Sequence, residues 1–559
     1  MSGAGLARVP AIVVVGGGIS GLAAAWALTH PSAGEASCRV TLVDGAPALG
    51  GKIATEPFAG IDLDTGPDSF LARVPAATRL ACEAGLGDDL VAPATGQAWI
   101  WAARRLPGGE RLRGGEQLRA LPPGLVLGVP TDLGALARSR VLSPQAAARA
   151  ALDLVLPGEP LDPAADIAVG ELVRRRMGRS VQLDLVDPMI GGINAGHTDT
   201  LSAAVAAPQL LAAARSSTSL VRGLRTAAAG RAPGVPVGRQ VGDPAGPGAG
   251  VPGAGVPWAG GSVGGVLGRP GEAGGGMAVG APETAAPVFL TVRGGLSRLV
   301  EALARGIASV AGTEMVVGDA VTTISRDDQR FTVRLASGRS LPADAVVVAC
   351  PVPTAAALIQ ALSPTAAAGL RAIGTASVAL TTLSYPAKAL PRPLMGSGFL
   401  VPRAKGRLLT ACSWVGQKWP HLGVNGRVVI RASAGRVDDV RALTMDDDDL
   451  VDALHHELVS AMGLQERPVE ARVHRWLDAF PQFGVGHLDR VDAIERSLEV
   501  DAPGVTVAGA ALRGVGLATC VTGGRAAAIR AREHAASALA AADISTSAPG
   551  RAGHNHAGA

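Results

Sequence analysis

The chain has 559 residues, a formal net charge of +4 at pH 7 and a hydrophobic fraction of 48%. The hydrophobic fraction excludes a wholly disordered protein, and the small charge gives no reason to expect a nucleic-acid partner. Its 75 glycines follow no three-residue period, which excludes collagen. Its five cysteines lack a CxxC pair, which argues against a disulfide framework, a zinc ribbon or an iron–sulfur cluster and favours a reducing compartment.

The N-terminus carries no basic segment followed by a long apolar stretch, and no run of 18 uninterrupted apolar residues occurs in the chain. We therefore expect a cytoplasmic protein without a secretory signal or a spanning helix. Peripheral contact with the inner face of the membrane is left open.

The first 44 residues carry the strongest local pattern. The β-branched run 11–15 predicts a buried parallel strand, residues 22–28 predict a helix, and residues 38–43 predict a second strand that ends at Asp44. The motif Gly16-x-Gly18-x-x-Gly21 separates the first strand from the helix. Its glycines permit a tight turn, close approach of a pyrophosphate and close helix–strand packing, and an acid after the second strand can bind a ribose. This unit predicts a dinucleotide-binding site.

The middle of the chain predicts further elements. An amphipathic pair of helices is expected at 166–186, and single helices at 203–228, 295–308 and 353–362. A strand is expected at 343–349 and a strand-rich region at 376–435. The runs 314–317, 320–326 and 330–335 predict a small antiparallel meander. The acidic run 446–449 is expected to begin a helix at the positive end of its dipole, with a metal site as the alternative.

The glycine motif alone does not separate FAD from NAD. A second glycine doublet at 50–51 and a terminal strand, glycine turn and helix across 504–541 favour FAD. Such a terminal block would point backbone N–H groups of a helix start at an electron-rich ring. For that block alone, an ordinary strand, turn and helix is the alternative.

Several longer blocks then resemble a known family. GGGISGLAAAW, GGKIATE and GIDLDTGPDSFL are similar to blocks of the FAD-dependent protoporphyrinogen and coproporphyrinogen oxidases, within the flavin amine oxidase superfamily. The resemblance continues in order through LPPGLVLGVPTD, QKWPHLG, WLDAFPQFGVGH and VTVAGAALRGVGLATC, and it skips residues 230–287. It implies an α/β fold with a Rossmann-type FAD-binding domain, an antiparallel-sheet substrate domain and a helical lobe.

The expected domain organisation combines this resemblance with composition. The FAD-binding domain is expected to be assembled from residues 1–119, 288–355 and 497–541. Residues 120–229 form the helical lobe and residues 356–496 the substrate domain. A Gly/Pro-rich insertion at 230–287 and the tail at 542–559 are predicted to be disordered.

The resemblance also implies a set of FAD contacts, with no metal and no catalytic side chain. The implied cofactor-binding residues are Gly16, Gly17, Gly18, Ile19, Ser20, Gly21, Leu22, Asp44, Gly50, Gly51, Lys52, Gly66, Pro67, Asp68, Ser69, Val321, Trp476, Val515, Gly516 and Leu517. The first seven would hold the pyrophosphate, Asp44 the adenosine ribose, and Val321 the adenine. Trp476 would lie beside the flavin, with a plain core position as its alternative.

On the substrate side the resemblance implies Arg73, Ser397 and Phe399. Family members that use protoporphyrinogen tend to carry Phe where this chain has Ser397, within Gly396-Ser397-Gly398. The small polar residue is similar to the Gram-positive coproporphyrinogen type. We therefore expect a more carboxylated macrocycle as the substrate.

The expected function is FAD-dependent oxidation of coproporphyrinogen III to coproporphyrin III in haem biosynthesis, with molecular oxygen as the acceptor. Protoporphyrinogen IX is the alternative substrate. More distant possibilities are a flavin amine oxidase, a carotenoid desaturase and an inactive flavin-binding scaffold. The expected partners are the porphyrinogen and oxygen, with no nucleic acid, and contact with downstream haem-pathway enzymes is left open.

Overall fold

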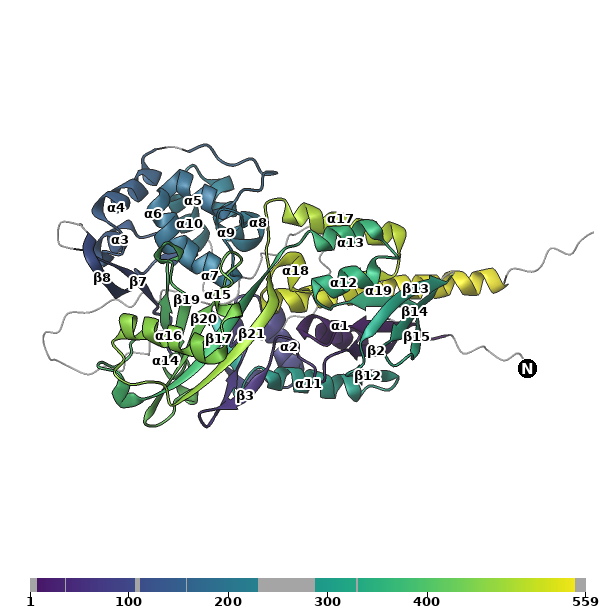
Figure 1. The fold of residues 1–559 in the computed structure, drawn as a ribbon. Helices are drawn as coiled ribbons and strands as arrows, with labels where there is room; N and C mark the ends of the chain where they lie inside the picture. Colours follow the sequence, from purple (N-terminus) through teal and green to yellow (C-terminus); the bar gives the residue numbers. More distant parts are fainter. Residues whose placement is uncertain are drawn as a thin grey trace, which may run out of the picture.

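The fold is organised around two large β-sheets, one parallel and one almost wholly antiparallel, with a group of helices beside the second (Figure 1). The computed structural model describes residues 8–35, 37–105, 111–156, 158–229, 287–327 and 330–547. The predicted disordered insertion, apart from residue 287, and the tail beyond residue 547 lie outside the described residues.

The parallel sheet has five strands, and three distant parts of the chain contribute to it. Its order is β12 (Thr313–Val317), β2 (Arg39–Asp44), β1 (Ala11–Val15), β16 (Ala345–Val348) and β22 (Val505–Val507). The central strands are β-branched runs buried on both faces, as parallel strands generally are.

Helices cover both faces of this sheet because successive side chains of a strand point to opposite sides. Ile12 and Val14 pack with α1 (Ile19–Thr29), α11 (Ser297–Ala308) and α19 (Leu517–Ser547). Val13 and Val15 pack on the other side, where the helices are α12 (Val352–Ile359), α13 (Pro364–Arg371) and α17 (His487–Asp501). The result is the doubly wound arrangement expected for the α/β fold class.

One strand prediction is wrong. Residues 314–317 do not join an antiparallel meander: they belong to β12, which pairs in parallel with β2 at the edge of the five-stranded sheet. The meander consists instead of β13 (Val321–Asp327), β14 (Arg330–Leu335) and β15 (Ser340–Ala343). The partner of β12 lies some 270 residues earlier in the chain, a distance over which local patterning carries no information.

The second sheet has seven strands. Its order is β21 (Glu470–Pro481), β17 (Thr375–Pro386), β20 (Arg427–Ala434), β19 (Leu409–Trp414), β18 (Gly398–Leu400), β7 (Trp99–Arg105) and β8 (Arg111–Ala120). All neighbours are antiparallel except β18 and β7. Helix α16 (Asp447–Met462) packs its leucines on one face of this sheet, which leaves the other face to the site described below.

Helix α16 begins where the acidic run predicted it. Asp446 is its N-cap, and the Asp446 carboxylate accepts from the Asp449 backbone N–H at 2.8 Å. Three further aspartates occupy the first turn, where the helix dipole favours negative charge.

Shorter strands form three further small sheets. They are β3 (Thr55–Phe58) with β4 (Ile61–Asp64), β9 (Leu125–Val126) with β10 (Val129–Pro130), and β11 (Phe289–Val292) between β5 (Phe70–Leu71) and β6 (Leu90–Val91). Helix α2 (Pro75–Glu83) packs against α19.

The helical group packs around one apolar cluster. Its members are α3 (Leu133–Ser139), α4 (Pro144–Ala151), α5 (Val169–Met177), α6 (Arg179–Val181), the π-helix η3 (Gln182–Gly191), α7 (Gly192–Asn194), α8 (Ala203–Ala206), α9 (Pro208–Ser216) and α10 (Leu220–Ala229). The helix pair predicted at 166–186 corresponds to α5 and to α6 with the start of η3, and the single helix predicted at 203–228 is divided into α8, α9 and α10. Pro208 starts a new helix because it has no N–H to continue the previous one.

Within the part of the chain that the structure describes, no helix is long and apolar enough to span a lipid bilayer.

Candidate functional site

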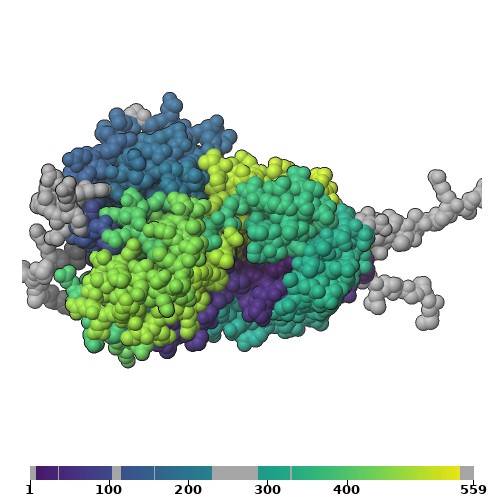
Figure 2. Space-filling model, in the orientation of Figure 1, coloured from purple at the N-terminus to yellow at the C-terminus, as the bar shows by residue number. Residues whose placement is uncertain are grey.

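A cavity of about 620 Å³ lies between the two sheets. Its lining includes Val15, Val348 and Val507, the last residues of three parallel strands, together with residues of β17, β19, β20 and β21 from the seven-stranded sheet. The space-filling view shows a hollow between the yellow-green and the teal surfaces, and the purple N-terminal segment is visible in it (Figure 2). Crevices at the carboxyl ends of parallel strands are the usual ligand sites of open α/β sheets.

The glycine motif forms the tight turn that leads from β1 into α1. Gly16 has a φ of +109°, and a Cβ on it would lie 2.7 Å from the carbonyl oxygen of Ala349. A Cβ on Gly21 would lie 1.8 Å from the carbonyl oxygen of Gly16, so only glycine lets α1 approach the turn. Asp44 accepts from the Gly17 backbone N–H and also from the Ala46 backbone N–H at 2.8 Å. The backbone thus leaves room at a helix N-terminus, as a pyrophosphate requires.

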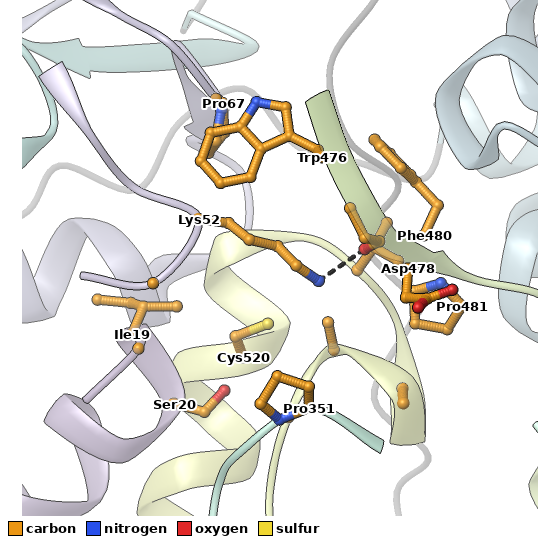
Figure 3. Close-up of a pocket in the computed structure, with 18 of the residues that line it drawn as sticks. Ile19, Ser20, Lys52, Pro67, Pro351, Trp476, Asp478, Phe480, Pro481 and Cys520 are labelled. Carbon is orange, nitrogen blue, oxygen red and sulfur yellow. Dashed lines mark hydrogen bonds between the residues drawn. The ribbon is translucent and has the colours of Figure 1, made fainter. Parts of the chain in front are cut away.

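The second glycine doublet lies directly against the first motif. Gly50 donates its backbone N–H to the carbonyl oxygen of Gly17 at 2.9 Å, and Gly51 has a φ of +60°. Next to them, Lys52 points across the cavity and donates to the carbonyl oxygen of Ala479 at 2.7 Å (Figure 3). Burial lowers the pKa of Lys52, against the opposing influence of Cys520.

The turn 66–69 is held by a buried network of charges. Asp68 accepts from Lys418 Nζ at 2.8 Å, and Arg431 Nη1 lies 3.6 Å from the same carboxylate. Arg431 also donates to the carbonyl oxygen of Gly66 at 2.5 Å. Burial alone would raise the pKa of Asp68, but the charges of Lys418 and Arg431 outweigh it and hold that pKa well below its usual range.

The indole of Trp476 forms a wall of the cavity. Its Nε1 donates to the carbonyl oxygen of Thr65 at 2.9 Å, and a Cβ on Gly66 would lie 3.5 Å from its ring. In Figure 3 it lies beside Pro67 and on the same side of the cavity as Lys52. The hydrogen bond fixes the ring edge-on to the turn, so that its apolar surface borders the cavity.

The terminal block closes the opposite side. Gly509 has a φ of +144°, and the chain then passes through α18 (Ala510–Arg513) and Gly514 into α19. Val515, Gly516 and Leu517 line the cavity at the start of α19. A Cβ on Gly524 would lie 2.1 Å from the carbonyl oxygen of Ser20, so α19 packs closely on α1. Two helix N-termini therefore meet at one cavity.

The structure gathers most of the predicted cofactor residues into this lining. They are Gly16, Gly18, Ile19, Ser20, Asp44, Gly50, Gly51, Lys52, Gly66, Pro67, Asp68, Ser69, Val321, Trp476, Val515, Gly516 and Leu517. Gly17, Gly21 and Leu22 do not line it. Gly17 and Gly21 shape the turn from behind, and Leu22 is fully buried in the core.

The three predicted substrate residues lie outside the lining. Arg73 is exposed between β5 and α2. Ser397 donates to the carbonyl oxygen of Gln97 at 3.1 Å. Phe399 is 1% exposed and packs between Trp101 and Trp414. Its neighbour Leu400 lines the cavity instead, because alternate residues of a strand point to opposite faces.

Sequence reasoning missed two buried arginines of the lining, Arg431 and Arg436. Arg431 lies within the strand RVVIRASA, where Ala432 and Ala434 pack into the core on the other face. The alternation of this strand could have indicated that Arg431 faces a cavity, because an arginine is rarely buried without a partner.

Comparisons with known proteins agree with this geometry. A family model described as flavin containing amine oxidoreductase matches residues 19–531. A coproporphyrinogen III oxidase of Bacillus subtilis is 30% identical over 517 residues, which cover 92% of this chain and 96% of that protein. A second, from Propionibacterium freudenreichii, is 33% identical over 519 residues, covering 92% and 89%. A crystal structure from Exiguobacterium sp. 255-15 aligns with a TM-score of 0.73 at 28% identity, over 94% of this chain and 99% of that one.

The residues at the cavity fit the cofactor that this match implies. Gly16, Gly21 and Gly50 leave no room for a Cβ, whereas Gly18 faces open space at the start of α1. Two helix N-termini line the cavity, and Asp44 lies at the end of β2, as a ribose-binding acid does. Because the family model spans most of the chain, the chain belongs to the family of flavin-containing amine oxidoreductases, and its cofactor is FAD.

Proposed function

We propose that this protein oxidises coproporphyrinogen III to coproporphyrin III, a six-electron reaction with molecular oxygen as the acceptor. The observation that carries the proposal is the continuous cavity that joins the glycine turns to an apolar chamber on the seven-stranded sheet. The names of the Bacillus and Propionibacterium relatives support the same reaction. Each macrocycle loses six electrons and six hydrogens and consumes three molecules of oxygen, which become three of hydrogen peroxide.

The chamber suits a large apolar ring. Leu400, Val378, Ile193 and Phe480 line it, together with Ala411. Apolar walls with a few placed polar groups are typical of sites for large organic ligands. These side chains would bind the macrocycle by its faces and exclude water from it.

Bound FAD would supply a two-electron acceptor at flavin N5 and pass the electrons to oxygen. The task of the chain is then to bind and orient. The backbone of the two glycine turns would hold the pyrophosphate, Trp476 and the start of α19 would border the ring, and the Arg431–Asp68 network would keep the turn 66–69 in place. Each two-electron round removes one hydride and one proton from the macrocycle, and both end in the hydrogen peroxide formed from oxygen. We assign no side chain to carry that proton.

A cytoplasmic location is part of the proposal. All five cysteines are free thiols in the structure, including the buried Cys412 and Cys520. Free thiols are the usual state in reducing compartments.

The proposal is tested by aerobic turnover. Purified protein should be yellow with bound FAD, should convert coproporphyrinogen III to a fluorescent porphyrin, and should release three equivalents of peroxide. Protoporphyrinogen IX assayed alongside gives the ratio of kcat/KM for the two substrates. A colourless protein would overturn the proposal, and a yellow protein that no porphyrinogen reduces would favour the inactive scaffold.

A further inference from the structure

The guanidinium of Arg436 is a buried cation of the cavity that has no role in the proposed function as described so far. Arg436 is 8% exposed and lines the cavity. Within the described ranges, its one direct side-chain hydrogen bond runs from Nη2 to the carbonyl oxygen of Val401 at 3.2 Å. A buried guanidinium has five N–H donors, so this cation has donors left over for a ligand.

The neighbouring carboxylates are already engaged by other arginines. Arg403 lies 3.4 Å from Asp187 and also pairs with Asp438. Asp439 accepts from Arg441 Nε at 2.8 Å and from its Nη2 at 2.7 Å. Burial, followed by the charge of Arg403, lowers the pKa of Arg436, and Asp187 opposes this. Arg436 therefore lacks a carboxylate of its own at ion-pair distance among the residues that the structure describes.

The backbone holds Arg436 firmly at the cavity. Its backbone N–H donates to the carbonyl oxygen of Asp439 at 3.0 Å, and the next residue, Val437, donates to the carbonyl oxygen of Ala195 at 2.8 Å. Before it, Gly435 has a φ of +97° and a Cβ there would lie 2.9 Å from the carbonyl oxygen of Ser377. A side chain on such a fixed turn is well suited to bind a ligand in one orientation.

The other cations of the cavity lie at the turns expected to hold the cofactor, since Lys52 directly follows Gly50 and Gly51 and Arg431 binds the turn 66–69. Lys52 donates to the carbonyl oxygen of Ala479, and Arg431 binds Gly66 and Asp68. Arg436 is instead anchored beside Leu400, through the Val401 carbonyl, and so belongs to the apolar chamber. A guanidinium among apolar walls is the arrangement that recognises a carboxylate on an otherwise apolar molecule.

We propose that Arg436 binds a propionate carboxylate of the porphyrinogen and so fixes which edge of the macrocycle enters the chamber. This inference rests on the proposed function for the identity of the ligand. Charge-assisted hydrogen bonds of this kind form in pairs between a guanidinium and a carboxylate, and each desolvated pair strengthens binding.

The test compares Arg436→Gln, Arg436→Lys and the matched control Arg467→Gln. Arg467 is an exposed arginine paired with Asp452 in the same part of the fold. Two quantities are measured: the Kd of the product coproporphyrin III, by fluorescence titration of the FAD-loaded protein, and KM against kcat for coproporphyrinogen III. For Arg436→Gln we expect Kd and KM to rise about 10- to 100-fold, the range for one lost charge-assisted bond, with a smaller change in kcat. Arg436→Lys should recover part of the loss, and Arg467→Gln should behave like the wild type.

A ligand without carboxylates provides the second arm. The tetramethyl ester of coproporphyrin III should bind the wild type as weakly as the free acid binds Arg436→Gln, and that variant should not distinguish ester from acid. Wild-type affinity of Arg436→Gln for the free acid would overturn the inference, as would equal affinity of the wild type for acid and ester. If Arg436→Gln is purified without FAD, the inference is tested by Arg436→Lys and by comparing the affinities of the wild type for the acid and the ester. A wild type that binds coproporphyrin III but oxidises no porphyrinogen would overturn the proposed function alone.

Discussion

Lys418 Nζ lies 2.8 Å from Asp68 Oδ2, and their side chains are only 9% and 12% exposed. Lys418 ends α14 (Val415–Lys418), which follows β19 of the seven-stranded sheet, whereas Asp68 belongs to the turn that borders the cofactor cavity. Trp419 Nε1 adds a donor at 3.3 Å from the same oxygen. This pair therefore ties the turn 66–69 at the cavity to the helix that follows β19.

We expect Lys418→Met to destabilise the fold by about 3–5 kcal/mol, because it leaves the buried carboxylate of Asp68 without its nearest partner. The free energy of unfolding is measured by denaturant titration of the FAD-loaded protein. Lys388→Met is the control, since Lys388 pairs with Glu466 but is 78% exposed, and such surface pairs contribute about 0–1 kcal/mol. Equal losses for the two variants would contradict a special role for the Asp68 pair.

Asp64 should make stability depend on pH in the opposite sense to most carboxylates. Burial raises its pKa from 3.8 to about 6, although Thr55 Oγ1 and the Leu296 backbone N–H donate to it at 2.6 and 2.9 Å. Between those two values the folded protein holds a proton that the unfolded chain has lost. The contribution of Asp64 to stability therefore falls as pH rises from about 4 to about 6, and the full penalty is present above pH 6.

Asp64→Asn should remove this dependence, because the amide oxygen keeps both hydrogen bonds and never ionises. The shift corresponds to at most about 3 kcal/mol, so the variant should gain stability over the wild type at pH 7 but not at pH 4. Thermal unfolding between pH 4 and 7 measures the difference. Parallel curves for the two proteins would mean that Asp64 does not titrate in this window.

The third glycine of the motif should be essential for FAD binding. A methyl group at Gly21 would lie 1.8 Å from the carbonyl oxygen of Gly16, a backbone atom that cannot move without opening the turn. We expect Gly21→Ala to be purified largely without flavin. The ratio of absorbance at about 450 nm, where bound flavins absorb, to that at about 280 nm measures the flavin content.

Gly523→Ala is the matched control for that change. A methyl group at Gly523 meets no atom within 4 Å, although this residue lies in α19, one turn from the cavity. It should keep its FAD and gain up to about 1 kcal/mol from better helix propensity. Loss of flavin from both variants would show that the effect is general to glycine replacement and not due to the turn.

Ser397→Phe tests the substrate role that the resemblance implied. Ser397 lies outside the cavity lining, with its backbone N–H and hydroxyl both bonded to Gln97. We therefore expect this variant to leave the ratio of kcat/KM for coproporphyrinogen III and protoporphyrinogen IX unchanged. A shift towards protoporphyrinogen IX would place residue 397 at the substrate and contradict the lining described above.

The sequence by itself determined the parts of the site that are local in the chain. The strand 11–15, the turn of Gly16 to Gly21 and the acid Asp44 lie within about 35 residues, so their periodicity and spacing are visible without a fold. At Gly16 and Gly21 the requirement for glycine is set by nearby backbone atoms, which a Cβ would meet at 2.7 and 1.8 Å. That is why local patterning predicts a dinucleotide-binding unit here, whereas the longer set of cofactor contacts was implied by the family resemblance.

Only the tertiary structure decided what depends on contacts between distant segments. β12 joins the parallel sheet through a strand some 270 residues away, and Arg431 meets Gly66 across 365 positions. Arg436 follows β20 and lines the cavity together with Val378 and Ile193, which come from distant parts of the chain. Phe399 faces the core because its strand neighbour Leu400 takes the cavity side. The pairing partners of a strand decide which of its faces lines the cavity and which faces the core, and local patterning does not specify those partners. The substrate side of this site is built almost wholly from such pairings.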